Sequence, residues 1–252
     1  GIPLAEAAPA GKGAGDEHFG IPQVKFINEQ IASVWADAGL QPSAPAADGE
    51  WCRRVHLDLI GRVPSVKELQ AFLTHSSPTK KADLVARLLG DEYVDEYARH
   101  FTDVWTTVLI GRDVENERVS RPGMRQYLRR AISKNLPYDR FMDDLVTATG
   151  VNANRNDLPG FNGATNFLSG KMEDMGVENG VQATAKTAQV FLGLQVQCTQ
   201  CHNHPFNDWQ QSQFWQFNSF FRQARRVDHR KPDPETGRLV DDYSEIVFQD
   251  FN

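Results

Sequence analysis

The sequence predicts a mainly α-helical fold: a multi-helix single domain with a long irregular loop before the helix that carries a CxxCH motif, and a short C-terminal β segment. Apolar residues recur every three or four positions through most of the chain between Val24 and Phe221, which is the period of an amphipathic helix. Strand-like alternation occurs only from Tyr243 to Phe251. With 252 residues the chain can bury a core without cross-links.

The N-terminal part divides into a flexible segment and a run of short helices. Residues 1–22 are rich in Ala, Gly and Pro, and we expect them to be flexible. The following VKFINEQIASVWADAG predicts a helix that Gly39 ends. A Pro- and Ala-rich linker separates it from the next helix, and Ser65 and Glu68 stand in the register of a capping box. Short helices are then expected over 50–61, 65–73 and 78–90.

Residues 91–112 carry the strongest helical pattern of the chain. An apolar stripe runs along one face of this predicted helix, and it includes His100. Two further helices are predicted over 121–135 and 139–149, separated by a turn at Pro137. The stripe consists of Tyr97, His100, Phe101, Val104, Trp105 and Val108.

The C-terminal part begins with the irregular loop, residues 150–177, which is dense in Gly, Asn and Pro. A helix is expected to follow and to run directly into Cys198, and an aromatic-rich helix comes after the motif. The strand at Tyr243–Phe251 has no evident partner, so we expect its sheet to lie beyond Asn252. The predicted organisation is a flexible segment over 1–22, a helical domain over 23–228, and over 229–252 a linker with the start of a following β region.

Composition describes a protein with no general attraction to nucleic acid. The formal net charge is −6 and the pI is about 5.7, so no nucleic-acid partner is expected. No apolar run approaches the roughly 20 residues that cross a bilayer, and no transmembrane segment is predicted in this chain. The Ala-, Gly- and Pro-rich start resembles the remnant left after a leader is removed, which favours an extracytoplasmic location, periplasmic or exported.

The stretch CTQCHNHPFNDW, residues 198–209, holds two cysteines and two histidines, side chains that can bind a cofactor or a metal. Cys198, Cys201 and His202 have the spacing of c-type haem attachment. In such sites two thiols one helical turn apart bond to the porphyrin, and the next residue offers its imidazole to the iron. The motif therefore predicts one covalent haem c, with His202 as the proximal iron ligand.

Two other readings of the same cysteines remain open at this point. A structural zinc site normally brings a second pair of ligands from elsewhere, and the chain's one other cysteine, Cys52, stands beside two arginines. A disulfide or redox-active CxxC is the other alternative, although no βαβ pattern surrounds Cys198 and Cys201.

The sixth iron ligand must come from elsewhere in the chain. All four methionines precede Cys198, so a methionine downstream of the motif is impossible. His100, on the apolar stripe, is the first candidate. Met172 and Met175, in the loop, are second choices.

The remaining histidines are expected to play other parts. His204, held in a turn by Pro205, is a candidate for contact with a haem propionate or a second metal, or for bonding to nearby backbone. His56, after an arginine pair, is expected to be exposed or to cap a helix, whereas His18 and His75 lie in polar stretches typical of the surface.

Five separated stretches together resemble one family: RRVHLDLIGRVPSVKELQAFL, YARHFTDVW, NLPYDRFMDDLVTATG, AKTAQVFLGLQVQCTQCHNHPFNDW and FWQFNSFF. They are similar to the planctomycete-specific c-type cytochrome domain, long described as a domain of unknown function, over about residues 24–227. The resemblance implies an exported, mainly helical domain inside larger multidomain proteins. It places the family's Arg-His-aromatic element on Arg99, His100 and Phe101, and its HxHPF element on His202, His204, Pro205 and Phe206. His56 and Cys52 depart from the family pattern.

These observations lead to one leading hypothesis and two rivals. The leading hypothesis is an exported monohaem cytochrome domain that exchanges electrons with redox partner proteins or with adjacent domains of a larger parent chain. The first rival is a haem- or metal-dependent extracellular oxidoreductase, which either leaves the sixth iron position open or uses His204 with loop carboxylates such as Asp174 or Glu178. The second is a non-haem interaction domain with zinc or a disulfide at the cysteines.

Overall fold

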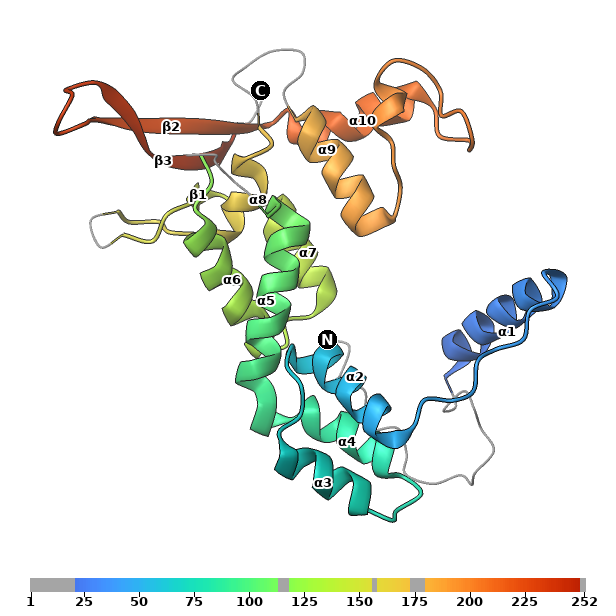
Figure 1. The fold of residues 1–252 in the computed structure, drawn as a ribbon. Coiled ribbons are helices and arrows are strands. Elements are labelled where there is room, and N and C mark those ends of the chain that lie inside the picture. The colour runs from blue at the N-terminus through green and yellow to red at the C-terminus, as the bar shows by residue number, and fades with distance from the viewer. Residues whose placement is uncertain (1–20, 113–117, 156–157, 173–179, 250–252) are drawn as a thin grey trace. The chain divides into compact units, whose positions relative to one another are not determined.

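The computed structural model describes residues 21–112, 118–155, 158–172 and 180–249. The prediction of a mainly α-helical protein is confirmed: ten α-helices and a small three-stranded sheet make up most of the regular structure in these ranges (Figure 1). In chain order the helices are α1 Pro22–Asp37, α2 Asp48–Ile60, α3 Val66–Thr74, α4 Lys80–Leu88, α5 Val94–Ile110, α6 Arg121–Ser133, α7 Tyr138–Val146, α8 Asn166–Ser169, α9 Val181–Thr187 and α10 Gln211–Phe221.

The chain folds as two compact units, residues 1–100 and 101–252. Helix α5 begins in the first and ends in the second. The domain boundaries expected at residues 22 and 228 stay a prediction. No helix in the described ranges is long and apolar enough to cross a membrane.

Helices α2, α3 and α4 build the core of the first unit, together with the beginning of α5. Ser65 caps α3 as predicted: its hydroxyl accepts from the Glu68 amide, and the Glu68 carboxylate accepts from the Ser65 amide. The same carboxylate accepts two hydrogen bonds from Arg62 and one from Tyr93. The fully or nearly buried apolar side chains of this core are Cys52, Ile60, Phe72, Leu84, Leu88 and Tyr93.

His56 lies inside this core, so the expectation that it is exposed or capping is wrong. Its side chain is 0% exposed, and its Nδ1 lies 2.9 Å from the Cys52 carbonyl oxygen. The reason is helical spacing: Cys52, His56 and Ile60 follow one another at intervals of four, which places all of them on one face of α2. His75 is exposed, as expected, and His18 lies outside the described residues.

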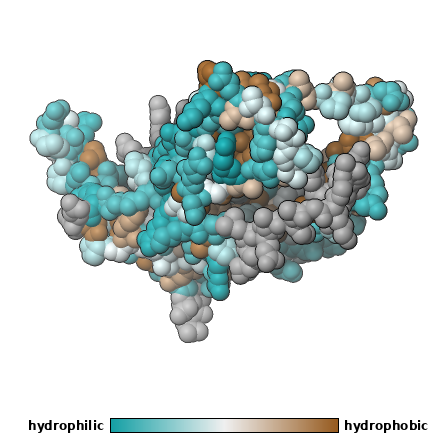
Figure 2. Space-filling model, turned by 90° about the horizontal axis from the view of Figure 1, so that it is seen from below, coloured by the Kyte–Doolittle hydropathy of each residue, from teal (hydrophilic) through white to brown (hydrophobic). Residues whose placement is uncertain are grey.

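Helix α1 forms where the pattern predicts it, but it buries none of its residues. The apolar side chains that define its stripe face solvent; Ile27 is 54% exposed and Val34 64%. Apolar patches of this kind interrupt an otherwise largely polar surface (Figure 2).

The predicted stripe of α5 is shifted by a few positions. Val104 and Val108 are 41% and 38% exposed, whereas Thr102, Thr106 and Leu109 are buried. The Thr106 hydroxyl is satisfied within the helix, because it donates to the Thr102 carbonyl four residues earlier. A pattern that counts only apolar residues therefore misses this face.

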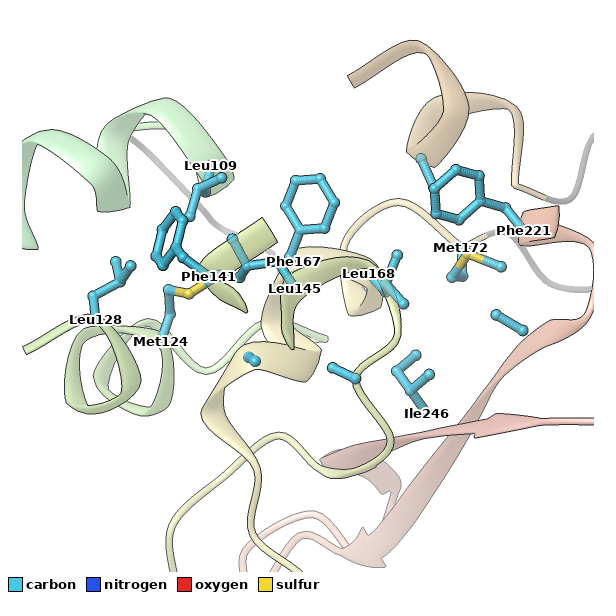
Figure 3. Packing of buried hydrophobic residues seen from close by; sticks show 14 of the residues in the cluster. Leu109, Met124, Leu128, Phe141, Leu145, Phe167, Leu168, Met172, Phe221 and Ile246 are labelled. Carbon is cyan, nitrogen blue, oxygen red and sulfur yellow. The ribbon is translucent and has the colours of Figure 1, made fainter. Parts of the chain in front are cut away.

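The second unit has its core between α5, α6, α7 and α8 (Figure 3). Trp105 meets Phe141 edge to face, with ring centroids 5.1 Å apart. The segment expected as a long irregular loop contributes directly to this core, because it holds strand β1 (Gly150–Val151), a 3-10 turn at Gly163–Thr165 and helix α8. Phe167 and Leu168 of α8 are both 0% exposed.

The sheet is wholly antiparallel, with strand order β1-β3-β2. Strand β3, Leu239–Phe248, includes most of the predicted strand and pairs with β2, Ala224–Pro232. The expectation that its partners lie beyond Asn252 is therefore wrong. The sequence signal of β2 is hidden because its solvent-facing charges obscure the alternation: Arg230 pairs with Asp241 at 2.9 Å and Lys231 with Asp242 at 2.7 Å.

Candidate functional site

The CxxCH motif does not continue a long helix, contrary to expectation. Helix α9 passes into a π-helical turn, Ala188–Leu192, and Gly193 ends it in the left-handed conformation, with φ +68°. A separate 3-10 turn, Gln197–Gln200, then carries the first cysteine. Glycine adopts a positive φ without the steric cost that other residues incur. Gly193 can therefore end the helix, and the motif begins in a separate turn.

Cys198, Cys201 and His202 are gathered into a single turn. The amides of Cys201 and His202 both donate to the Cys198 carbonyl, at 3.3 and 3.4 Å. Thr199, which lies between the two cysteines in sequence, is buried, and its hydroxyl donates to the Val196 carbonyl at 2.5 Å. The local hydrogen bonds thus hold the three residues predicted to bind haem within one turn of each other.

Both cysteines of the motif are free thiols. Cys198 is half-buried and Cys201 is exposed. They form no disulfide with each other or with Cys52, which is also a free thiol. The turn therefore presents two thiols that a reaction partner can approach from solvent.

His202 is exposed, and one of its ring nitrogens has a defined partner. Its Nδ1 lies 2.7 Å from the carbonyl oxygen of Asn203. Because a carbonyl oxygen only accepts, this contact assigns the proton to Nδ1 and leaves the lone pair on Nε2. An imidazole whose Nδ1–H bonds to a backbone carbonyl has the tautomer and fixed orientation of a metal-ligating histidine.

His204 uses both ring nitrogens within the loop. Its Nδ1 accepts from the Phe206 amide at 3.1 Å, and its Nε2 lies 3.2 Å from the Gln195 carbonyl, to which it donates. Its own amide donates to the Trp209 carbonyl at 2.8 Å. The imidazole therefore ties the chain before the motif to the chain after it, which is the backbone-bonded role. A contact with a propionate or a second metal stays a prediction.

Helix α10 anchors the other side of the turn. The Gln211 amide donates to the Asn203 side-chain oxygen at 3.0 Å. The carbonyl of Gln200 accepts twice, from the Gln211 side chain at 3.0 Å and from the Trp215 indole at 3.2 Å. These hydrogen bonds fix the motif to a regular helix, which lies beside α9 in the same unit (Figure 1).

An apolar cluster lies under the loop, and its outer members remain partly open to solvent. Val181, Ala188, Val196 and Phe214 are buried, with Leu194, Trp209 and Trp215 packed against them. Two apolar side chains of the same segment face solvent: Phe206 is 92% exposed and Leu192 53%. A flat, largely apolar group bound at the cysteines would cover surface of this kind.

Trp209 supplies the clearest fit to such a group. Its indole Nε1 is buried, yet it donates to no acceptor in the part of the chain described. An orphaned buried donor is costly and calls for a partner. Haem carries two propionates, which accept hydrogen bonds, so the residues beside the motif fit the group that the motif predicts.

The structure places the candidate distal ligands as follows. The half-buried His100 ring packs against Gly61, where an added Cβ would lie 2.5 Å from the His100 Nδ1. Met172 is 1% exposed in the core of the second unit, near Phe221 and Ile246 (Figure 3). Met175 lies outside the described residues, as do Asp174 and Glu178. The distal assignment stays a prediction.

The alternative of a metal ion held by protein ligands gains no support in the described ranges. Within them, no three His, Cys, Asp or Glu side chains gather as a metal site would require. Trp209 and Trp215 are two of the aromatic residues that the sequence suggests as core or haem-packing side chains, whereas sequence reasoning missed the contribution of Asn203. Its one signal is position, because a polar side chain just after a short cofactor motif is available to hold that motif in place.

The chain matches the model of a known protein family. A family model described as "PSCyt2: Protein of unknown function (DUF1549)" matches residues 26–226. The chain belongs to the PSCyt2 family. The match includes CxxCH, the His204 loop and α10, so the PSCyt2 domain contains the whole site described above. No curated protein and no solved structure matches the chain.

Proposed function

We propose that this PSCyt2 domain is a planctomycete c-type cytochrome domain that transfers electrons within a larger exported protein. One haem c would be bound through Cys198 and Cys201, with His202 as the proximal ligand of the iron. The resemblance of five separated sequence stretches to the c-type cytochrome family supports this identity.

The observation that carries the proposal is the arrangement of the two thiols and the imidazole in the CxxCH turn. Two free thiols and one imidazole share a single hydrogen-bonded turn, and the imidazole keeps its Nε2 lone pair. A zinc site would use additional ligands that the described residues do not bring there. A redox-active CxxC would use the thiols alone and would have no need of an oriented histidine.

In covalent attachment, each of the two thiols would undergo the same reaction with the haem. Each cysteine adds its S–H across one vinyl group: sulfur bonds to one vinyl carbon, the hydrogen goes to the other, and nothing is oxidised or reduced overall. The single turn keeps Cys198 and Cys201 on the same side of the loop, and His204 and Asn203 hold that turn closed. When bound, haem iron supplies a centre that gains and loses one electron.

Electron transfer, in preference to substrate chemistry, follows from the proposed ligands. His100 is the proposed sixth ligand, because a second imidazole fills the iron's remaining position. Met172 is less suited, since its side chain packs in the apolar core. His204 is also less suited to an open-site mechanism, because the loop already uses both of its ring nitrogens.

The proposed partners are redox proteins or adjacent domains of the parent chain. An extracytoplasmic location, periplasmic or exported, agrees with this role, because covalent attachment keeps the cofactor from being lost after export. No nucleic-acid partner is proposed, since the net charge is −6.

The test is production of the chain with an export signal and the c-type maturation machinery, followed by intact mass and absorption spectra. We expect a mass increase of one haem and a Soret band that survive denaturation. Cys198→Ala with Cys201→Ala should abolish both, whereas Cys52→Ala, the matched control, should keep them if the protein folds. A wild-type chain without haem mass or Soret band, in cells that mature another c-type cytochrome, would overturn the proposal.

The sixth ligand is tested separately in the matured protein. Replacing His100 by Ala should convert the low-spin spectrum to a high-spin or water-ligated one, with haem still attached. His75→Ala, an exposed histidine of the same unit, is the control and should leave the spectrum unchanged. An unaltered low-spin spectrum in the His100 variant would remove His100 as a ligand while leaving the attachment proposal standing.

A further inference from the structure

A cavity in the second unit is separate in sequence from the CxxCH segment and has a distinct chemistry. Its volume is about 500 Å³, within the range of small-molecule sites. It lies between the C-terminal part of α6, helix α7 and the chain that follows α7. The lining residues that matter are Tyr127, Arg130, Lys134, Asp144 and Thr149.

Two cations form one wall of this cavity. Arg130 and Lys134 stand four residues apart at the end of α6, so they lie on the same helical face. Neither side chain makes an ion pair with another residue of the described ranges. Like charges at this spacing destabilise a helix unless a countercharge is present. The helix C-terminus offsets part of that cost, and a bound anion would offset more.

Asp144 of α7 and Thr149 bring hydrogen-bonding groups to the cavity from outside α6. The hydroxyl of Tyr127, on α6, donates to Asp144 Oδ2 at 3.2 Å, which leaves Oδ1 of that carboxylate available. Burial is the largest cause that raises the pKa of Tyr127, so the phenol remains a neutral donor. The Thr149 hydroxyl makes no hydrogen bond with the described residues.

The backbone at Thr149 is held in place before any ligand arrives. The Asn162 side chain donates to the Thr149 carbonyl at 3.0 Å and accepts from the Ala164 amide at 3.1 Å. Apolar side chains complete the lining: Ala131, Leu136 and Ala148. The cavity thus combines two cations, a carboxylate oxygen with a threonine hydroxyl, and a small apolar area.

We propose that this cavity binds a hydroxylated organic anion about the size of a sugar acid. Arg130 and Lys134 would hold the anionic group, and the Arg130 fork suits a planar carboxylate. Asp144 Oδ1 and Thr149 would bond the hydroxyl groups, while the apolar area meets the C–H face of the ligand. A carboxylate in the lining disfavours long polyanions, so the ligand is a small molecule.

The test uses the full 252-residue chain, D-glucuronate as probe, and calorimetry with amide-shift mapping by NMR. We expect glucuronate to bind at the α6–α7 cavity at least tenfold more tightly than glucose, which lacks the charge, or acetate, which lacks the hydroxyls. Arg130→Gln with Lys134→Gln should weaken glucuronate binding at least tenfold. Arg140→Gln with Lys67→Gln is the control: it removes the same charge from exposed positions outside the cavity and should retain wild-type affinity.

Asp144→Asn tests the proposed contact with the ligand hydroxyls. It should narrow the preference for glucuronate over acetate, and acetate should bind at least as tightly as before, because a negative charge is removed beside the two cations. Thermal unfolding of each variant establishes that the fold persists. Equal binding of glucuronate, acetate and inorganic phosphate would identify a mere anion site and overturn the proposal. Absence of shifts at α6 and α7 with millimolar glucuronate would do the same, as would wild-type affinity in the Arg130/Lys134 variant.

Discussion

Cys52 with His56 and Cys198 with His202 are the same two residue types at the same spacing of four. On α2, both members are 0% exposed, and the Cys52 sulfur lies 3.7 Å from His56 Nδ1. In the CxxCH turn the cysteine is half-buried and the histidine is exposed. Identical spacing thus gives a buried pair in the core of one unit and a solvent-accessible turn in the other.

The difference teaches that neighbours decide the chemistry of a cysteine–histidine pair. Around Cys52 the core removes water, and this burial raises the pKa of the thiol. Cys198 lies in a 3-10 turn that follows the end of the preceding helix at Gly193, and α10 donates hydrogen bonds to this turn. The cysteine–histidine pair therefore lies at the surface. Accessibility, in addition to spacing, is therefore what a prediction of a cofactor site needs.

Thiol labelling should separate the two cysteine environments by the largest factor. In haem-free protein we expect Cys201 to react with a chromogenic disulfide at the rate of an exposed thiol. Cys52 should react at least about 1000-fold more slowly, because it must wait for unfolding. Mass spectrometry of the time course, with and without urea, measures both rates. Equal native rates at Cys52 and Cys201 would contradict the buried assignment.

Truncating the two histidines should then have unequal effects on stability. His56→Ala leaves a cavity in the first core and removes the hydrogen bond to Cys52, so we expect a loss of about 2–4 kcal/mol in the free energy of unfolding. His202→Ala removes an exposed side chain and should change it by less than about 0.5 kcal/mol. Urea unfolding of both haem-free variants checks this, and similar losses would refute the contrast.

Acid should weaken the unit that holds Cys52 more than it weakens the CxxCH turn. Hydrogen bonding from Arg62 is the largest cause that lowers the pKa of Glu68 in the folded state. A lowered folded pKa contributes stability that is complete above the ordinary Glu pKa of about 4.3 and is lost progressively as the pH falls below it.

Between neutral pH and about pH 3, the wild type should therefore lose about 1–2 kcal/mol more than Glu68→Gln. Unfolding monitored by hydrogen exchange in α2 to α4 is the measurement. The control is Glu50→Gln, which removes the exposed ion pair between Glu50 and Arg54 and should leave the acid dependence as in the wild type. Parallel pH profiles for the wild type and Glu68→Gln would count against this network.

A smaller loss of stability than that of His56→Ala is expected from a change in the CxxCH loop. His204→Ala removes two hydrogen bonds to backbone, and we expect about 1 kcal/mol of lost stability. The Phe206 amide, whose acceptor is His204 Nδ1, should exchange faster with solvent. His75→Ala serves as the matched exposed histidine. Unchanged exchange at Phe206 would show that His204 does not hold the loop.

Much of the fold could be predicted from periodicity, because most helices carry an apolar face of the expected period. What failed depended on polar atoms or on distant partners. His56 is a polar residue on a buried face, Thr102 and Thr106 replace apolar residues on another, and β2 hides its strand character behind paired charges. Tertiary contacts overrode local composition at each of these positions.

The candidate site also has one part that the sequence predicts and another that depends on tertiary contacts. The spacing of Cys198, Cys201 and His202 was sufficient to identify the candidate cofactor turn. The tautomer of His202 could not be predicted, because it depends on where the Asn203 carbonyl points. The orphaned indole of Trp209 required the packed cluster beneath it to be known.

The hydrogen bonds that close the CxxCH loop all join residues between Gln195 and Trp215. Contacts of such short sequence separation cost little loop-closure entropy and form among the first in folding. The loop can consequently assemble from a stretch of 21 residues before distant strands pair. For the proposed haem attachment, this means that the two thiols would already be arranged in advance of the completed fold.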